Sequence, residues 1–415
     1  GVIADQFYSE RLYTCEDLKR LLRTAGFMDV NRVDAPVTGS DRQQDLGMMA
    51  QRIFIVATAP ETRVRVQRRG PLFRDVTVLL GDPRLPDDVK REGQFNPEDI
   101  DTVQRMKNAL ASLREYNFAY WDDHESLLDF LKRERPAFVF NLCDEGFMND
   151  PFKELHVPAL LELFGIPYSG GAPACLGMCY NKALVRSIAQ SLEIPVPLET
   201  YSSPDDQAAT LPSLFPALLK PNFGDSSQGI TKEAVVHTKE ELIDYLEGLR
   251  RDFPRRPVLV QEFLTGPEYS VGVIGNPGLD VTVLPVLEVD YSGLPEGLPP
   301  ILGYESKWIP DSPYWNEIRY HEAEIGETTK RALNDYSLAL FERLECRDYA
   351  RFDFRADAQG RIKLLEVNPN PGWCWDGKLN YMAGFGGLNY ADLLRLVIEA
   401  AQSRYQAAGI LAETR

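Results

Sequence analysis

The chain has 415 residues, 44% of them hydrophobic and 26% charged, and this length and apolar content fit about two to four globular domains. Its net charge of −17 would repel phosphate polymers, which argues against a nucleic-acid partner but not against ATP, because local basic groups and metal ions decide nucleotide binding. No apolar run approaches the roughly 18 residues of a membrane span, and no signal pattern follows Gly1, so we expect a cytoplasmic protein without a membrane partner.

The six cysteines are irregularly spaced, which is typical of reduced thiols in a cytoplasmic protein. Cys175 and Cys179 form the one close pair, and no second pair or histidine cluster in the sequence matches them. We therefore expect no zinc site.

Residues 1–60 are predicted to form a small N-terminal appendage. Thr14 and Asp17 are spaced as a helix cap, and Gly26 is a stop signal, which predicts a helix over residues 12–27. Weak alternation predicts a strand over residues 52–57. The stretch TCEDLKRLLRTAGF resembles the last helix of a class I methyltransferase, but no Gly-rich cofactor turn precedes it, so we expect no methyl transfer. A poorly specified appendage is the alternative.

Residues 61–172 alternate between predicted strands and helices. Apolar runs predict strands over residues 76–80, 118–121, 138–142 and 166–168. Helical spacing predicts helices over residues 101–113, 125–131 and 158–164. Strands that alternate with helices form parallel sheets, so we expect an α/β domain here.

The rest of the chain mixes the two patterns in another order. Helices are predicted over residues 181–192, 240–249 and 390–403, and strands over residues 215–220, 258–263, 268–274, 349–355 and 361–367. The last two strands flank a turn at residues 357–360, which predicts a β-hairpin.

The strongest cluster of candidate catalytic residues lies on this hairpin. Arg351 and Asp353 are two apart on one strand, and Glu366 and Asn368 are two apart on the other. Antiparallel pairing would therefore bring all four side chains to one surface. Two carboxylates and an amide oxygen suit Mg²⁺, and the guanidinium could face a transferring phosphate or an oxyanion. The turn that ends at Gly372 would let a backbone NH approach a substrate. A solvent-facing hairpin with alternating polar residues is the alternative.

Two other segments have the chemistry of nucleotide binding. Lys220 ends a predicted strand, and a Gly- and Ser-rich loop that suits phosphate binding follows it, although the Walker P-loop pattern is absent. Glu268 follows a turn and could bind ribose hydroxyls. Ordinary turns have the same composition, and Lys182 and Lys307, taken singly, would be solvated surface lysines.

Residues from about 136 to 400 resemble the D-alanine–D-alanine ligase branch of the ATP-grasp superfamily. The segments that carry the resemblance occur in the family's order and spacing: FVFNLCDEG, LLELFGIPYSGG, NKALVRSIAQSLEIPVP, ALLKPNFGDSSQGI, VQEFLTGPEYSVGV, ESKW and YARFDF…LLEVNPNPGW. The resemblance implies an α/β, three-part ATP-grasp fold after the appendage. Its parts would be an N-terminal domain over residues 61–172, a central subdomain over residues 173–262 and a C-terminal subdomain with the metal site over residues 263–415.

The resemblance also implies that the nucleotide is ATP. The phosphates would be bound by Lys182, Lys220, Ser226, Ser227 and Lys307. The adenine would lie against the backbone of Glu262, Phe263 and Leu264 and the side chain of Leu365, and Glu268 would bind the ribose.

The implied metal is Mg²⁺, as two ions replaceable by Mn²⁺, held by Asp353, Glu366 and Asn368. The implied catalytic groups are Arg351, Ser226, Lys307 and the NH of Gly372. In the implied reaction, the carboxylate of one small molecule attacks the γ-phosphate, and the amine of another displaces phosphate from the acyl-phosphate. Relatives are commonly dimers, so the resemblance implies a homodimer.

The chain departs from the family pattern where the substrates would bind. After the predicted strand over residues 76–80 there is no glutamate of the kind that holds the first D-alanine in the family. Residues 143–145, Cys-Asp-Glu, replace a His-Gly pair, and Trp308 replaces a tyrosine. The region of the second substrate contains Trp373, Trp375, Asp376 and Lys378. We therefore expect a carboxylate–amine ligase for an amino acid or amino-acid derivative other than D-alanine.

Three alternatives remain open at this point. The chain could be a D-alanine–D-alanine ligase of cell-wall synthesis, a nucleotide-binding regulator without activity, or a carboxylate kinase that transfers phosphate without ligation. An intact set of metal ligands and lysines argues against the regulator.

Overall fold

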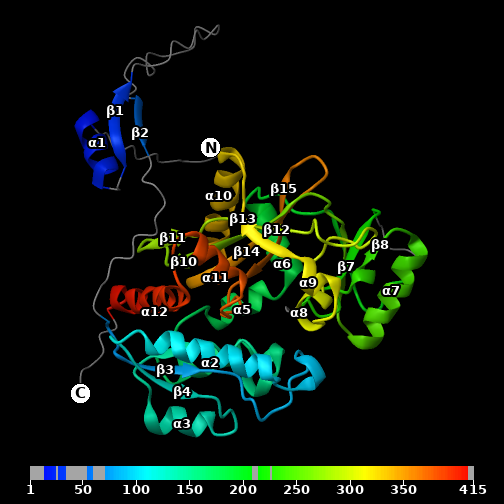
Figure 1. Cartoon of the computed structure of the whole chain (residues 1–415), viewed down its shortest axis with the longest axis horizontal. Helices are drawn as coiled ribbons and strands as arrows, with labels where there is room; N and C mark the ends of the chain where they lie inside the picture. Colours follow the sequence, from blue (N-terminus) through cyan, green and yellow to red (C-terminus); the bar gives the residue numbers. More distant parts are fainter. Residues whose placement is uncertain are drawn as a thin grey trace, which may run out of the picture. The chain divides into compact units, whose positions relative to one another are not determined.

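The computed structural model describes residues 14–24, 27–33, 54–58, 71–207, 214–224 and 227–409 (Figure 1). The chain separates into two compact units, residues 1–65 and residues 66–415. Among the helices of the described residues, none is both long and apolar enough to cross a membrane.

The first unit contains the helix α1 (Cys15–Thr24) and an antiparallel pair of strands, β1 (Met28–Val33) and β2 (Phe54–Thr58). The Thr14 hydroxyl accepts a hydrogen bond from the Asp17 amide at 3.1 Å, and the Asp17 carboxylate accepts one from the Thr14 amide at 3.2 Å. This reciprocal cap confirms the predicted helix start, whereas the predicted stop at Gly26 lies outside the described residues. The strand β1 was not predicted, because it is short and its alternation of apolar and polar residues breaks at Arg32.

The second unit begins with a small parallel sheet in the order β4-β3-β5, formed by β3 (Asp75–Leu79), β4 (Asn117–Trp121) and β5 (Val139–Asn141). The helices α2 (Pro97–Ala111), α3 (Leu127–Glu134) and α4 (His156–Leu163) connect and follow these strands. Asn96 and Asp99 cap α2 reciprocally, so the helix starts earlier than its apolar spacing predicted. The predicted strand over residues 166–168 is reduced to one parallel bridge between Tyr168 and Val139. The parallel α/β prediction for this region is confirmed.

A four-stranded antiparallel sheet follows, in the order β6-β9-β7-β8. Its strands are β6 (Glu199–Ser202), β7 (Ala217–Pro221), β8 (Val235–Val236) and β9 (Val258–Glu262). The helix α7 (Lys239–Asp252) packs its leucines on this sheet, and α5 (Pro173–Cys179) and α6 (Lys182–Ser191) precede it. The helix α5 was not predicted.

A six-stranded antiparallel sheet forms the rest of the unit. Along the order β13-β12-β10-β14-β15 the strands are β13 (Arg319–Glu322), β12 (Leu287–Asp290), β10 (Glu268–Gly275), β14 (Asp348–Ala356) and β15 (Ile362–Asn368), and β11 (Val281–Val283) also pairs with β10. The helices of this part are α8 (Glu305–Trp308), α9 (Pro313–Glu317), α10 (Glu327–Arg343), α11 (Lys378–Phe385) and α12 (Tyr390–Ala407). The pairing of β14 with β15 confirms the predicted hairpin.

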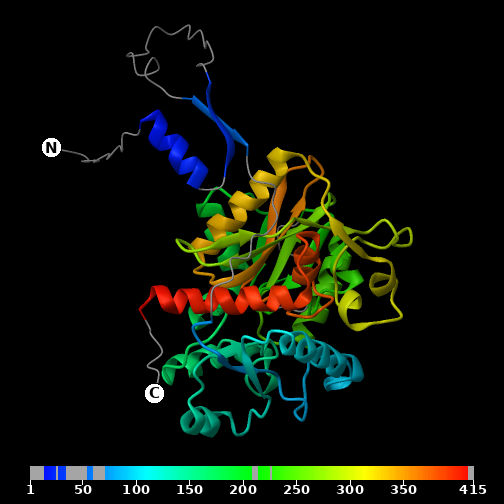
Figure 2. The ribbon, with the colours of Figure 1, turned by 60° about the vertical axis from the view of Figure 1, so that its left-hand side comes forward.

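The two faces of this sheet have separate cores. Val271, Phe352 and Phe354 pack with α10, α5 and α6 on one face, whereas Ile274 and Tyr349 pack with α11 and α12 on the other. Successive residues of β10 and β14 thus point to opposite faces, as a strand requires. Figure 2 shows α12, in red, lying between the six-stranded sheet and the parallel-sheet region, in cyan.

Gln402 on α12 fastens the parallel-sheet region to this core. Its side-chain oxygen accepts hydrogen bonds from the amides of Leu72 at 2.7 Å and Phe73 at 3.2 Å, and its amide nitrogen donates to Phe73 O at 3.0 Å. The Gln402 side chain is buried, so these bonds satisfy backbone groups that water does not reach.

Candidate active site

The four polar residues predicted on the hairpin meet on one face of β14 and β15. Arg351 pairs across the hairpin with Asn368, and Asp353 pairs with Glu366. Arg351 donates to both carboxylate oxygens of Asp353 at 3.0–3.1 Å, and Asn368 Nδ2 donates to Asp353 Oδ2 at 3.1 Å and to Glu366 Oε1 at 3.4 Å. The predicted convergence is therefore present, and a solvent-facing hairpin is excluded because Asp353 is buried.

A β-bulge at Leu365 sets this geometry. Asp353 pairs with Glu366 while the next residue, Phe354, pairs with Leu364, so Leu365 is an extra residue on its strand. Glu366 consequently lies on the face of Asp353, while Leu365 lines a pocket together with Lys182 and Lys220. The alternation of polar and apolar residues in the sequence does not reveal this bulge.

Ser270 and Lys378 belong to the same cluster, although neither was predicted there. Ser270 pairs with Asp353 across β10 and β14, and its hydroxyl donates to Asp353 Oδ1 at 2.5 Å. Lys378, on the first turn of α11, donates to Ser270 Oγ at 3.0 Å and lies 3.5 Å from Asp353 Oδ1. The sequence signal was the spacing of Ser270 two residues beyond Glu268, whereas nothing local to Lys378 indicated its target.

Opposing effects act on the two carboxyl groups. Burial favours the neutral form of Asp353, but the neighbouring Arg351 and Lys378 hold the pKa of Asp353 well below its ordinary value. Burial also opposes ionisation of Glu366, yet Lys182, Lys307 and Arg351 lower the pKa of Glu366. Both groups are therefore carboxylates at neutral pH, the form that binds a cation.

Three of the predicted phosphate ligands surround this cluster. Lys182 begins α6, whose N-cap Asn181 accepts a hydrogen bond from Asn222 just beyond β7. Lys220 lies near the end of β7 and lines the same pocket as Lys182 and Glu366. Burial and the charge of Lys182 lower the pKa of Lys220 below its ordinary value. Lys307 on α8 is exposed and acts electrostatically on Glu366.

The loop after β7 is tied to the segment before α8. Ser227 has a positive φ of 58° and donates its hydroxyl to Leu302 O at 2.9 Å, and the Tyr304 amide donates to Ile230 O at 2.7 Å. Ser226 lies outside the described residues. The Ser227 hydroxyl already has a protein partner here, so phosphate contact would require its release.

The predicted adenine segment is partly engaged within the protein. The amides of Glu262 and Phe263 donate to Leu198 O at 2.8 Å and Pro216 O at 3.0 Å, so these two amides are not available to a base. The Glu262 carboxylate forms an ion pair with Lys363. Leu264 is buried beside this segment.

The predicted ribose ligand, Glu268, is buried and bonded to protein groups. It accepts a hydrogen bond from the Tyr291 hydroxyl at 2.7 Å and lies 3.5 Å from Arg355 Nη1 and 3.8 Å from Lys378 Nζ. Glu268 thus adjoins the metal-type cluster through Lys378, and a ribose would have to exchange with one of these partners.

Gly372 lies beyond β15, at the end of the Asn-Pro-Asn-Pro-Gly turn. Asn370 in this turn accepts a hydrogen bond from the Tyr349 hydroxyl and donates to Glu154 at 2.5 Å, which fixes the turn. A Cβ atom on Gly372 would meet no atom within 4 Å. The space beside Gly372 is therefore open to a ligand.

Two of the segments that depart from the family pattern contact each other. The indole NH of Trp373 donates to Leu142 O at 2.7 Å and to Asp144 at 3.2 Å, which makes Trp373 a buried link between the parallel-sheet region and the turn at Gly372. Burial and the adjacent Glu145 raise the pKa of Asp144 well above its ordinary value. Trp375 is partly exposed and stacks on Arg105.

Comparisons with known proteins agree with this architecture. A D-alanine–D-alanine ligase of Bacillus anthracis, solved with ATP, superimposes with a TM-score of 0.60 at 20% identity, over 81% of this chain and all of that one. A D-Ala:D-Ser ligase of Enterococcus faecalis superimposes with a TM-score of 0.56 at 18% identity, over 79% of this chain and 99% of that one. At this identity the likeness establishes the fold, which confirms the predicted α/β ATP-grasp class.

Sequence comparison defines the family. The protein-family model that describes the D-Ala–D-Ala ligase C-terminus matches residues 201–399 of this chain. A D-alanine–D-alanine ligase of Actinobacillus pleuropneumoniae is 30% identical over 304 residues, 71% of this chain and 90% of that enzyme. The uncharacterised protein y4sG of Sinorhizobium fredii is 30% identical over 314 residues, 73% of this chain and 89% of that protein.

The fold and the site thus define an ATP-grasp ligase. The chain belongs to the D-alanine–D-alanine ligase family. The likeness of residues 1–60 to a methyltransferase tail has no support in these comparisons and stays a prediction.

Proposed function

We propose that the chain is a carboxylate–amine ligase that transfers the γ-phosphate of ATP to a substrate carboxylate, releasing ADP, and then forms an amide as an amine displaces phosphate from the acyl-phosphate. The observation that carries this proposal is the meeting of Arg351, Asp353, Glu366 and Asn368 within hydrogen-bond distance of one another. Lys182 and Lys307 act on the same cluster. Cations beside buried carboxylates suit a reaction in which two anions, a carboxylate and a phosphate, must approach each other.

The donor set fits Mg²⁺. Asp353 and Glu366 are ionised, and Asn368 adds an amide whose oxygen can turn to the cation once its nitrogen releases the two carboxylates. These three residues would hold two ions, and Mn²⁺ would substitute for Mg²⁺. Bound there, the metal would supply positive charge that reduces the repulsion between the nucleophile and the phosphate.

The protein's own groups would bind and orient the reactants. Lys182 and Lys220 would bind the α- and β-phosphates, with Ser226 and Ser227 over them and Lys307 at the terminal phosphate. Adenine would lie against Leu365 and the backbone of residues 262–264, and Glu268 would bind the ribose. Arg351 and the NH of Gly372 would stabilise the oxyanion of the tetrahedral intermediate.

For the substrates, we propose an amino acid or amino-acid derivative other than D-alanine. The support is chemical: Asp144, Glu145 and Trp373 occupy the region where the family has a His-Gly pair and small residues, and Trp373 is fixed there by two hydrogen bonds. A second candidate is D-alanine–D-alanine ligation, which is favoured by the similarity to D-alanine–D-alanine ligases of Haemophilus influenzae and Actinobacillus pleuropneumoniae.

An ADP-release screen over amino acids, dipeptides and amino-substituted metabolites tests both candidates, with D-alanine in the panel. ADP release that needs both a carboxylate and an amine supports ligation, whereas release with the carboxylate alone indicates a kinase. D-alanine as the best substrate would replace the first candidate with the second. Glu366→Gln serves as the inactive control, and ADP release that persists in this variant would point to a contaminant.

A further inference from the structure

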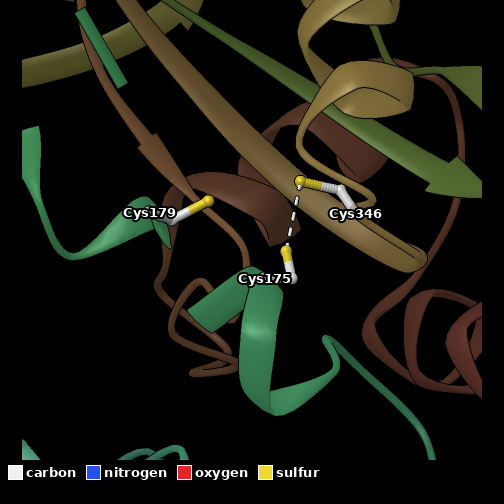
Figure 3. A group of neighbouring side chains, drawn as sticks. All are labelled: Cys175, Cys179 and Cys346. Atoms are coloured by element: carbon white, nitrogen blue, oxygen red, sulfur yellow. Dashed lines mark hydrogen bonds between the residues drawn. The ribbon is translucent and has the colours of Figure 1, made fainter. Parts of the chain in front are cut away.

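Three cysteine side chains from two segments far apart in the chain meet in one core, and the proposed reaction uses none of them (Figure 3). Cys175 and Cys179 lie one turn apart on α5, and Cys346 follows α10. The three sulfurs all lie within 4.8 Å of one another, and Cys175 Sγ is 3.7 Å from Cys346 Sγ. All three are free thiols.

The spacing of Cys175 and Cys179 predicted no zinc site because the sequence near them offers no further ligand. The fold supplies one from 171 residues away, where Cys346 faces α5. The sequence-based expectation therefore rested on neighbours in the chain, and tertiary contact changes the ligand count from two to three.

The positions of these thiols are fixed by the backbone. Glu345 has a positive φ of 55°, and the Cys346 amide donates to Phe341 O at 2.9 Å, which is a Schellman-type end of α10. On the other side, Arg347 Nε donates to Gly170 O at 2.8 Å. The group is thus held in place without a ligand, which reduces the entropy that binding would cost.

The separations fit a thiolate-bound metal ion. With metal–sulfur bonds of about 2.3 Å, the sulfurs of a tetrahedral or trigonal site are about 3.8–4.0 Å apart. The observed contact of 3.7 Å and the limit of 4.8 Å bracket this range. A disulfide, by contrast, would need two sulfurs at about 2.05 Å.

The chemistry of the surroundings selects the ion. Among the described residues no carboxylate or imidazole joins the three thiols, so the donor set is entirely soft sulfur. The charge of Arg347 acts on Cys175 and, with the ion itself, would offset thiolate charge in this buried core. Buried cysteines can also pack simply as small apolar side chains, and this is the reading that experiment must separate.

We propose that Cys175, Cys179 and Cys346 form a binding site for one thiophilic d¹⁰ cation, Cu⁺ or Zn²⁺. Each thiol that binds as a thiolate releases one proton to solvent. Cu⁺ would be three-coordinate, whereas Zn²⁺ would add a water molecule as its fourth ligand. The bound ion would fasten α5, and with it Lys182 at the start of α6, to the junction of α10 and β14. Metal binding by these cysteines would not require the chain to be a ligase.

Metal analysis of the full chain tests the site. Reduced, metal-free protein is equilibrated with Zn²⁺ or Cu⁺ in a competing chelator, with excess Mg²⁺ to occupy carboxylates, and unbound metal is removed. One ion per unmutated chain is expected, and none in Cys175→Ala or Cys346→Ala. Cys143→Ala is the matched control, because Cys143 is equally buried in a different core and should leave binding intact. The ion that the unmutated chain retains, Cu⁺ or Zn²⁺, is the ion that the site binds.

Two measurements on the unmutated chain keep the test valid if a variant fails to fold. Cd²⁺ as a probe should give the ultraviolet charge-transfer band of three thiolates, and the added Cu⁺ or Zn²⁺ should raise the unfolding temperature. Absence of both effects, retention of metal in both cysteine variants, or a Cys175–Cys346 disulfide in the purified chain would overturn the proposal in favour of apolar packing or oxidation.

Discussion

The guanidinium of Arg351 donates from Nε to both oxygens of Asp353, at 3.1 Å each, and from Nη2 to Oδ2 at 3.0 Å, although the two residues lie on the same strand. This fork holds the Arg351 side chain along β14, beside Glu366 and Asn368 on the next strand. A cation held in this way needs little reorganisation when charge develops on a substrate oxygen.

For Arg351→Ala we predict a loss of roughly 10²–10³-fold in turnover, the scale for one oxyanion donor. Steady-state kinetics of ADP release measure it. Arg361→Ala is the matched control, because Arg361 is an exposed arginine of the same hairpin that pairs with Asp357. Nearly unchanged ligation in Arg351→Ala would remove this residue from the mechanism.

For Lys378→Gln we predict that the acid limb of the pH–rate profile moves to higher pH. Arg351 and Lys378 together lower the pKa of Asp353, so loss of one cation raises this pKa and the carboxylate becomes protonated at a higher pH. The profile of kcat/KM against pH measures the shift. Lys153→Gln, an exposed lysine, should leave the profile in place, and an unshifted limb in Lys378→Gln would contradict the electrostatic role.

Lys220 gives a prediction at alkaline pH. Burial and Lys182 lower its pKa, and only the protonated form attracts phosphate, so ATP affinity should decline as pH rises from neutral toward 10.5, the ordinary value for lysine. Lys220→Arg should bind ATP with a flatter dependence, since a guanidinium stays charged throughout this window. Titrations of ATP binding measure it, with circular dichroism at each pH as a check on folding. Parallel declines in both proteins would refute the assignment to Lys220.

For Trp308→Tyr we predict a changed preference among acceptor amines with nucleotide affinity largely kept. Tryptophan donates one hydrogen bond and accepts none, whereas the tyrosine found here in the family does both. Relative kcat/KM values over a set of amines, together with the ATP dissociation constant, measure the change. An effect confined to ATP binding would show that Trp308 serves the nucleotide instead.

Gln402→Leu tests the attachment of the parallel-sheet region. The substitution leaves the backbone groups of Leu72 and Phe73 without their partner, and one such buried loss costs about 1–3 kcal/mol. Urea unfolding of the chain measures it. Gln406→Leu, on the exposed side of the same helix, should change the free energy of unfolding little, and equal effects in the two variants would argue against the hydrogen-bond explanation.

Local patterns predicted much of the fold. The parallel strands β3, β4 and β5 were visible as apolar runs, and the hairpin of β14 and β15 was visible as two strands around Asp357 to Gly360. The helix α5 and the strand β1 were missed. The helix α5 is a short apolar segment, and the alternation of apolar and polar residues in β1 breaks at Arg32. Their structure depends on contacts with distant residues.

The sequence by itself determined which polar side chains share one surface of the hairpin, because the two-residue spacing of Arg351 with Asp353 and of Glu366 with Asn368 places each pair on one face of its strand. Only the tertiary structure decided three further features: the bulge at Leu365, the arrival of Lys378 beside Asp353, and the meeting of Cys346 with Cys175 and Cys179. The physical reason is that strand periodicity is a property of neighbouring residues, whereas these contacts form between segments that only the packed sheet and its helices bring together.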